Sequence, residues 1–218
     1  MQYKAIISDF DGTLYYQFPV RILMLLWLII YYVIFPLRIK ELFFLREFRR
    51  LQEKRFGANT ENFYRAQLDR ASRLYNLNHN KAESLINLWM IIRPLRMIKF
   101  FRRRRLISCL KSCQEIGIKI IIYSDNPVKE KITAINFTPD YAFWSCDEII
   151  KCMKPDSHGL INIINFLGIN QSEALYIGDR YDRDGLCAKS AGIDYIDVKN
   201  LADTYFPAIN RGEQNAKK

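Results

Sequence analysis

The sequence predicts an α/β fold, in which a parallel β-sheet carries helices on both faces, together with a basic, apolar segment inserted near the N-terminus. Two observations predict it. Short apolar runs alternate with amphipathic stretches of about ten to fifteen residues from position 106 onward, and one further apolar run, YKAIIS at 3–8, lies near the start. The chain has 218 residues, half of them hydrophobic, which is enough for one large domain or for a domain with an inserted module.

The first three elements of the sheet domain follow from local patterns. The apolar run at 3–8 ends at a glycine-containing loop and is predicted to be the first strand. LISCLKSCQEIG (106–117) has apolar residues at helical spacing, and Gly117 is expected to end the helix. IKIIIY (118–123) has the composition of a strand that is buried on both faces.

The remainder of the chain repeats this alternation. VKEKITAINF (128–137) is predicted to be a helix and YAFWSC (141–146) a weaker strand. HGLINIINFLG (158–168) is predicted to be a helix that ends at its last glycine. ALYIG (174–178), a helical GLCAKSAG (185–192) and DYIDV (194–198) complete the series. In such sheets, functional residues collect at the carboxyl ends of the strands.

Charge is distributed unevenly along the chain. The net charge is +10, but residues 14–105 alone contain 19 basic and 6 acidic residues, a net charge of +13. The rest contains 14 basic and 17 acidic residues, a net charge of −3. An excess of this size in one segment indicates an anionic partner, such as a membrane surface, a nucleic acid or a phosphorylated substrate.

The cysteines and the N-terminus bear on the cellular compartment. The five cysteines are scattered, with no CxxC pair and no zinc-finger spacing, which indicates reduced thiols and a cytoplasmic protein. The opening residues MQYKAIISDF lack the pattern of a signal peptide and are expected to begin a strand.

Charged and hydroxyl side chains are predicted to meet at one edge of the sheet. Asp9 and Asp11 follow the first strand, Ser124 follows the second and Asp179 follows the fourth, while Lys154 lies on a loop that can reach the same edge. Clustered carboxylates repel one another unless a cation joins them, and hard oxygen ligands favour Mg²⁺. A lysine can neutralise a phosphate oxygen, while a hydroxyl and backbone N–H groups donate to others. This set of residues predicts phosphoryl-transfer chemistry.

Four segments carry a resemblance to a known family. DFDGT (9–13), the Ser124 of IIYSDN, Lys154-Pro155-Asp156 and GDRYDRD (178–184) resemble, in order, the four motifs of the haloacid dehalogenase (HAD) superfamily, phosphatase type. The resemblance implies a Rossmann-like catalytic core formed by residues 1–13 and 106–200. It also implies that residues 14–105 form an α-helical cap inserted after the first motif. Residues 201–218 are predicted to form a polar C-terminal tail.

The resemblance implies a role for the two aspartates of the first motif. Asp9 is expected to attack phosphorus and form an aspartyl-phosphate, which divides one difficult displacement into two easier ones. Asp11 is expected to protonate the leaving oxygen and then to activate water. Dehalogenase members of the superfamily lack the second aspartate, so its presence favours phosphate chemistry. Gly12 lets the loop turn close to the substrate, and Thr13 is expected to support that loop.

The other motifs supply phosphate and metal ligands. Ser124 and Lys154 are expected to hold the phosphoryl group. Asn126 is expected either to end its loop with Pro127 or to offer its backbone N–H to phosphate. The predicted metal ligands are Asp9, the backbone carbonyl of Asp11, Asp179 and Asp184.

The position of Asp184 in the metal site leaves an alternative open. Asp184 matches the last position of a GDxxxxD pattern, and it either ligates the ion or orients Lys154. Asp182 is a nearby competitor for the same place.

Together these roles predict an Mg²⁺-dependent phosphohydrolase that cleaves a phosphate monoester. Two alternatives are a phosphomutase, in which the aspartyl-phosphate passes to a sugar hydroxyl, and a non-catalytic membrane-associated adaptor. The expected partner is a small phosphorylated substrate, and a lipid-linked phosphate is among the candidates.

The segment from Phe18 to Leu37 has the length of a bilayer span and contains one charge, Arg21. A single crossing would separate the first strand from the others, although all must join one sheet. The one candidate for a second crossing, residues 84–101, carries three basic residues, each costing about 2.5–3.5 kcal/mol at the bilayer centre. Two full spans are therefore excluded.

Two interpretations of this segment remain. In the first it is a buried cap helix, covered by apolar faces that include Leu42, Phe43, Leu74 and Leu77. In the second, residues 18–55 contact an anionic membrane surface, with basic residues toward lipid and three aromatic residues at headgroup depth: Trp27, Tyr31 and Tyr32. The protein would then be peripheral on the inner face of the membrane. Binding to nucleic acid is not expected, since no stacking aromatics or recognised module accompany the arginine run 102–105.

Overall fold

The computed structural model describes residues 3–54 and 62–201, so nearly all of the predicted tail at 201–218 lies outside the described residues. The chain divides into two compact units, Met1–Tyr16 with Arg102–Lys218, and Gln17–Phe101. These boundaries differ by three or four residues from those predicted at 13/14 and 105/106. The reason is local: Tyr15 and Arg102 form an antiparallel bridge and the Arg103 N–H donates to the Leu14 carbonyl at 2.8 Å, so both connections belong to the first unit.

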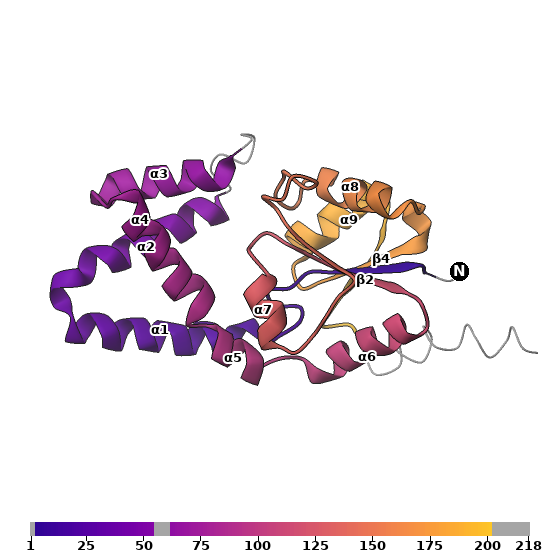
Figure 1. The fold of residues 1–218 in the computed structure, drawn as a ribbon, viewed down its shortest axis with the longest axis horizontal. Helices are drawn as coiled ribbons and strands as arrows, with labels where there is room; N and C mark the ends of the chain where they lie inside the picture. Colours follow the sequence, from indigo (N-terminus) through magenta and orange to yellow (C-terminus); the bar gives the residue numbers. More distant parts are fainter. Residues whose placement is uncertain (1–2, 55–61, 202–218) are drawn as a thin grey trace, which may run out of the picture. The chain divides into compact units, whose positions relative to one another are not determined.

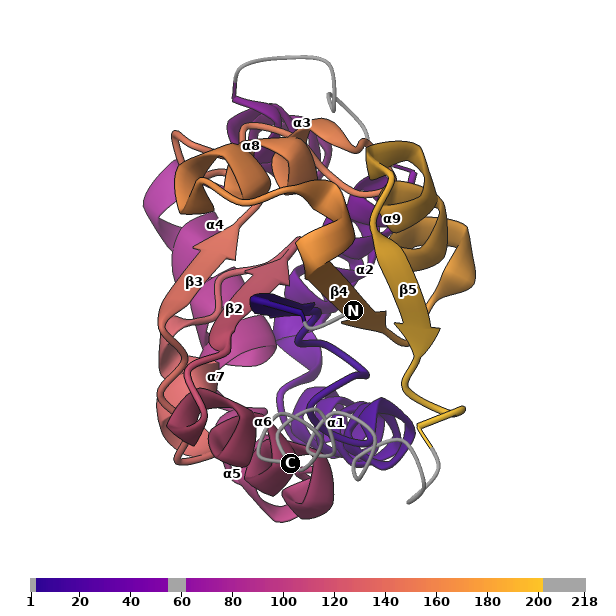
Figure 2. The same cartoon turned by 90° about the vertical axis from the view of Figure 1, so that its right-hand side faces the viewer.

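The first unit is built on a five-stranded parallel sheet with the strand order β3-β2-β1-β4-β5 (Figure 2). The strands are β1 Ala5–Ser8, β2 Lys119–Ser124, β3 Tyr141–Trp144, β4 Ala174–Gly178 and β5 Asp194–Asp197. β1 lies at the centre, where Ile7 pairs with Ile121 on one side and Tyr176 on the other. All of these side chains are fully buried, as the uninterrupted apolar runs in the sequence predict.

Helices cover both faces of the sheet, with α8 and α9 on one face and α6 and α7 on the other (Figures 1 and 2). Their bounds are α6 Arg104–Glu115, α7 Lys129–Ala134, α8 His158–Leu167 and α9 Leu186–Ala191. Leu160 and Ile163 of α8 pack with Ile7 and Ile121 of the sheet in one hydrophobic core. The α/β, Rossmann-like fold predicted from the sequence is therefore confirmed.

In its described residues the second unit consists of helices and short connections between them. It consists of α1 Gln17–Ile34, α2 Ile39–Glu53, α3 Phe63–Tyr75, α4 His79–Ile86 and α5 Leu95–Phe100, with helical turns at Pro36–Arg38 and Asn87–Ile92. Asn62 and Asn78 begin α3 and α4, since each side-chain oxygen accepts a backbone N–H of the first turn. Within this unit α1 and α3 lie at opposite edges, with α2 and α4 between them (Figures 1 and 2).

The apolar segment after the first motif forms α1, and most of its surface is exposed. By length and composition α1 could cross a membrane, with a mean hydropathy of 1.8, but one such helix is weak evidence and only 17% of it is buried. Its buried residues are Val20, Met24 and Tyr32. Phe43 and Leu74, predicted to cover this helix in one interpretation, are themselves 44% and 52% exposed. The segment is therefore not the buried cap helix of that interpretation.

Candidate active site

Asp9 lies directly after β1, where its backbone N–H donates to the Ile177 carbonyl of β4 at 2.8 Å. This bond continues the sheet pairing for one residue and aims the carboxylate past the sheet edge. Thr13 donates to one carboxylate oxygen at 3.2 Å and Lys154 to the other at 2.6 Å. Burial raises the pKa of Asp9 well above its ordinary value, and the nearby carboxylates of Asp184 and Asp179 add to that effect against the opposing charge of Lys154.

Asp11 is held by three donors from three parts of the first unit. The Lys131 ammonium donates to both carboxylate oxygens, at 2.9 and 2.7 Å. The Tyr15 hydroxyl donates to one oxygen and the Asn126 side-chain amide to the other, each at 2.9 Å. Burial by itself would raise the pKa of Asp11, but the Lys131 charge and these hydrogen bonds outweigh it and lower that pKa. Asp11 therefore stands as a carboxylate in this arrangement.

Lys154 lies at the centre of the site and is almost completely buried. Its ammonium donates to Asp9 at 2.6 Å and to Asp184 at 2.8 Å, and its backbone N–H donates to Asp125 at 3.0 Å. Burial would lower the pKa of Lys154, yet the three surrounding carboxylates raise it well above its ordinary value. The lysine is thus a fixed positive charge among buried negative ones.

The predicted competition between Asp182 and Asp184 has a clear geometric outcome. Asp184 is buried, where it accepts from Lys154, from the Tyr176 hydroxyl at 3.0 Å and from the Arg180 backbone N–H at 3.1 Å. Asp182 is exposed and pairs with the Arg180 guanidinium at 2.8 Å. The helical turn Tyr181–Gly185, which the sequence analysis did not foresee, separates these two side chains.

Three carboxylates form a group that fits a divalent cation. Asp9, Asp179 and Asp184 each offer one oxygen, and these oxygens lie within 4.8 Å of one another. Burial, followed by the Asp184 charge, raises the pKa of Asp179 to about 6. An all-oxygen donor set whose charges disfavour one another fits a hard cation such as Mg²⁺, because the ion offsets that repulsion.

Gly12 allows this close approach of two loops. Its φ is +102°, in the region that favours glycine, and a Cβ at this position would collide with the Asp179 carboxylate. The first motif therefore needs glycine here both for its backbone conformation and for the space beside the metal-binding group.

Ser124 ends β2, and Asn126 lies in the loop that follows it. Ser124 is the last residue of the strand and is buried, and its hydroxyl oxygen accepts the Asn126 backbone N–H at 3.1 Å. The backbone N–H of Asn126, a candidate donor to phosphate, is therefore hydrogen-bonded within the loop. The side-chain amide of Asn126 donates to Asp11 at 2.9 Å. Asn126 thus links the second motif to the first.

The sequence reasoning missed two charged residues of the site, the buried Lys131 and the half-buried Asp125. One signal for Lys131 was available: it lies on the apolar stripe of α7 formed by Val128, Ile132 and Ile135, where a lysine needs a buried partner. Asp125 accepts the Lys154 backbone N–H and pairs with Arg183 at 3.5 Å, and nothing in the local sequence indicates either partner.

Comparison with protein families places this chain in a known family. The sequence matches the haloacid dehalogenase-like hydrolase family over residues 3–192. The chain belongs to this family. The HAD resemblance of the four motifs is thus confirmed, and the protein is a HAD-like hydrolase. A comparison with curated proteins finds no match.

Solved structures of other HAD proteins share the fold. A 2-haloacid dehalogenase from Pseudomonas syringae pv. Tomato has a TM-score of 0.61 at 17% identity, covering 89% of this chain and 85% of that one. YfnB from Bacillus subtilis, a HAD protein bound to magnesium, has a TM-score of 0.61 at 14% identity, covering 96% and 100%. A HAD phosphatase from Thermococcus onnurineus has a TM-score of 0.53 at 18% identity, covering 88% and 84%. At these identities the likeness shows the HAD fold alone.

Proposed function

We propose that this HAD-like hydrolase is an Mg²⁺-dependent phosphohydrolase that cleaves phosphate monoesters through an aspartyl-phosphate on Asp9. The observation that carries the proposal is the second aspartate of the first motif, Asp11, held by three donors two residues after Asp9. Similarity of fold cannot choose the reaction, because the solved neighbours include haloacid dehalogenases as well as a phosphatase. Dehalogenase members lack the second aspartate, so its presence supports phosphate chemistry.

The carboxylate group supports the metal requirement. Asp9, Asp179 and Asp184 would hold the ion, with the backbone carbonyl of Asp11 as the fourth predicted protein ligand. A bound Mg²⁺ supplies positive charge that offsets the carboxylates and the phosphate oxygens. YfnB, which shares the fold, is bound to magnesium, and this also supports the choice of ion.

In the first step, a carboxylate oxygen of Asp9 attacks phosphorus, and the bond between phosphorus and the ester oxygen breaks. Asp11, a carboxylate in the free site, takes up a proton from water as the negatively charged substrate binds and passes it to the departing oxygen, which leaves as an alcohol. Lys154 stabilises the negative charge near the attacking carboxylate, since its ammonium already lies 2.6 Å from Asp9. Ser124, at the end of β2, is proposed to donate its hydroxyl proton to the phosphoryl group.

In the second step, water attacks the phosphorus of the aspartyl-phosphate and gives a proton to Asp11. The bond between phosphorus and the Asp9 oxygen breaks, which releases inorganic phosphate and restores the carboxylate. The proton that this step leaves on Asp11 balances the one that the first step delivers. The lowered pKa of Asp11, due chiefly to Lys131 acting against burial, suits its role as the base here.

Replacing Lys131 with methionine is expected to move the acid limb of the kcat–pH profile to higher pH. Without the ammonium, burial of Asp11 is no longer outweighed, so its pKa rises and the base form is lost at a higher pH. The measurement is kcat across pH for Lys131→Met beside Lys129→Met, an exposed lysine of the same helix. An acid limb that moves equally in both variants, or in neither, would contradict this role.

Replacing Asp184 with asparagine is expected to weaken Mg²⁺ binding at least about tenfold. The control is Asp182→Asn, since that side chain is exposed and pairs with Arg180. Calorimetric titration with MgCl₂ measures the affinity independently of turnover. Equal affinities for the two variants would mean that Asp184 positions Lys154 and does not ligate the ion.

The experiment that tests the function is phosphate release from a panel of sugar, nucleotide and lipid phosphate monoesters, with and without Mg²⁺. Halide release from 2-haloacids is measured in parallel. Metal-dependent phosphate release without halide release is the expected result. Halide release alone would overturn the proposal in favour of a dehalogenase, an isomerised sugar phosphate in favour of a phosphomutase, and inactivity on all substrates in favour of an adaptor.

The compartment proposed from the sequence is the cytoplasm. All five cysteines are free thiols, which supports a reducing environment.

A further inference from the structure

The most unusual surface of the second unit is the exposed side of α1 together with the turn that follows it. We propose that this surface, the α1 face, docks on an anionic phospholipid bilayer. It consists of large apolar side chains that are all more than a third exposed: Phe18, Ile22, Leu23, Leu25, Leu26, Trp27, Ile29, Ile30, Val33, Ile34, Phe35 and Leu37. Contiguous apolar patches of this kind are rare on proteins whose surface contacts only water.

The helical geometry explains why so much apolar surface remains uncovered. The buried residues Val20, Met24 and Tyr32 recur at multiples of four and form one narrow stripe, which packs into the second unit. The sixteen residues from Ile22 to Leu37 contain no charge, so the rest of the circumference is apolar as well. A helix that is apolar on nearly all sides is more stable in an apolar environment than in water.

Exposure runs the whole length of α1, which indicates that the helix lies along the membrane. Phe18 near its start is 75% exposed, Val33 near its end is 73% exposed, and Leu37 in the next turn is 97% exposed. A crossing orientation is excluded by topology, because β1 precedes α1 and the other strands follow it, yet all belong to one sheet. The α1 face therefore enters only the interface of one leaflet.

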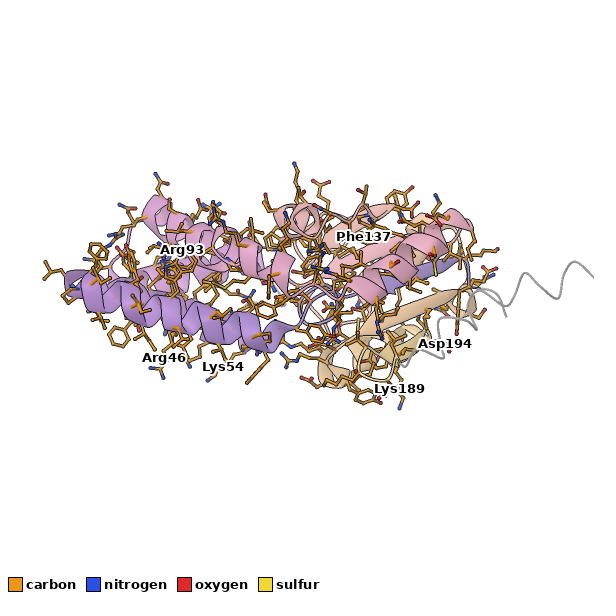
Figure 3. All side chains as sticks on the ribbon, turned by 90° about the horizontal axis from the view of Figure 1, so that it is seen from below. Arg46, Lys54, Arg93, Phe137, Lys189 and Asp194 are labelled. Carbon is orange, nitrogen blue, oxygen red and sulfur yellow. The ribbon has the colours of Figure 1, made fainter. Side chains whose placement is uncertain are left out.

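Charge complementarity identifies the occupant as anionic. Residues 17–101 contain 15 basic and 6 acidic residues. In the projection of Figure 3, which views α1 from its outer side, Arg46 and Lys54 appear on one side of the helix and Arg93 on the other. Exposed basic residues follow the α1 face in the chain, namely Arg38, Lys40, Arg46, Arg49, Arg50 and Lys54. An apolar strip bordered by positive charge matches the acyl chains and headgroups of an anionic leaflet.

A group of aromatic rings around Arg93 lies beside this surface. The Arg93 guanidinium lies over the rings of Trp27, Tyr31 and Trp89, at 4.8, 4.9 and 3.6 Å from the ring centroids. Trp27 is 38% exposed, as expected for a ring at the boundary between lipid and water. Tyr32, which the sequence analysis placed with these aromatics at headgroup depth, is instead buried inside the unit.

The same charges argue against a second copy of the chain as the occupant. A symmetric dimer through the α1 face would bring two identical basic borders together, and like charges would repel across the contact. An anionic bilayer meets the apolar strip and the basic border at the same time.

The test is cosedimentation of the full chain with vesicles of phosphatidylcholine alone or of phosphatidylcholine mixed with phosphatidylglycerol. Binding to the mixed vesicles is expected to exceed binding to the neutral ones at least about tenfold, and to weaken as NaCl is raised. Equal binding to both compositions, or no binding to either, would overturn the proposal. No turnover is measured, so the outcome does not depend on the proposed phosphohydrolase activity.

Matched variants separate the apolar and basic contributions. Leu25→Glu places a charge on the α1 face and is expected to weaken binding at least about tenfold, while Leu74→Glu, at an exposed leucine of α3, leaves it unchanged. Arg46→Glu is expected to weaken binding to the mixed vesicles, and Arg73→Glu of α3, an equal change of charge, to weaken it less.

Two further outcomes bear directly on the proposal. Equal losses in Leu25→Glu and Leu74→Glu would overturn the assignment to α1. Sedimentation of the free protein gives the oligomeric state. A dimer that Leu25→Glu dissociates, without vesicle binding by the parent chain, would assign this surface to a second copy and overturn the proposal. Circular dichroism is expected to be unchanged in all four variants, because each replaced side chain is exposed.

Discussion

Replacing Asp9 with asparagine is expected to lower the rate of phosphate release by at least about a thousandfold. The amide lacks the negative oxygen that attacks phosphorus, so no aspartyl-phosphate forms. The fold is expected to survive, because Asp184 still lies 2.8 Å from Lys154 and compensates for its buried charge. The measurement is the initial rate of phosphate release with saturating Mg²⁺, together with urea unfolding of the variant.

The matched control for this variant is Asp182→Asn. Asp182 is an acidic residue of the fourth motif, but it is exposed and its partner is Arg180. Its replacement is expected to leave the rate within about twofold of the parent. A well-folded Asp9→Asn variant that keeps a substantial fraction of the activity would show that another group attacks phosphorus.

Replacing Lys154 with methionine is expected to lower the free energy of unfolding by about 3–5 kcal/mol at neutral pH without divalent metal. The methionine fills much of the same volume but leaves the carboxylates of Asp9 and Asp184 buried without the ammonium that pairs with both, and it removes a nearby positive charge from Asp125. Burial already raises the pKa of Asp9 and of Asp125 in the folded chain.

The pH dependence of this loss follows from those two shifts. A carboxyl whose pKa is raised by folding binds protons more readily in the folded state, so it favours folding as pH falls toward its ordinary range near about 4. The destabilisation by Lys154→Met is therefore expected to be largest above neutral pH and to shrink as the solution is acidified. Urea unfolding in EDTA across pH measures both effects.

The control for Lys154→Met is Lys119→Met. Lys119 also pairs with an aspartate, Asp140 at 2.8 Å, but its side chain is 57% exposed. Its replacement is expected to cost no more than about 1 kcal/mol. Similar losses of unfolding free energy in the two variants would contradict the view that the destabilisation by Lys154→Met arises from the burial of Lys154 and its carboxylate partners.

The sheet and the loop positions of its site residues could be predicted from the sequence because each depends on a local pattern. Buried parallel strands are short apolar runs, such as IKIIIY at 118–123, and the structure forms β2 at Lys119–Ser124. Parallel order then brings the residues at the carboxyl ends of β1, β2 and β4 to one edge, which is why Asp9, Ser124 and Asp179 could be grouped in advance.

The pairings within the site could not be predicted, because they depend on rotations and loop paths that strands do not fix. Lys131 contacts Asp11 only because the first turns of α7 direct it back toward the first motif. The choice of Asp184 over Asp182 depends on the helical turn at Tyr181–Gly185, which has no signal in the alternation of apolar runs. The degree of exposure of α1 likewise required its neighbours to be known, since Phe43 and Leu74 are apolar but remain 44% and 52% exposed.

The measurement that tests the central claim most directly is acid quenching of the enzyme during turnover of a phosphate monoester that it hydrolyses, followed by peptide mapping by mass spectrometry. The account predicts a phosphoryl group on the peptide that contains Asp9, removed by hydroxylamine as expected for an acyl phosphate. The label is expected to be absent from Asp9→Asn. Phosphate release with no phosphoryl group on any peptide, or with the group on another residue, would contradict the proposed nucleophile.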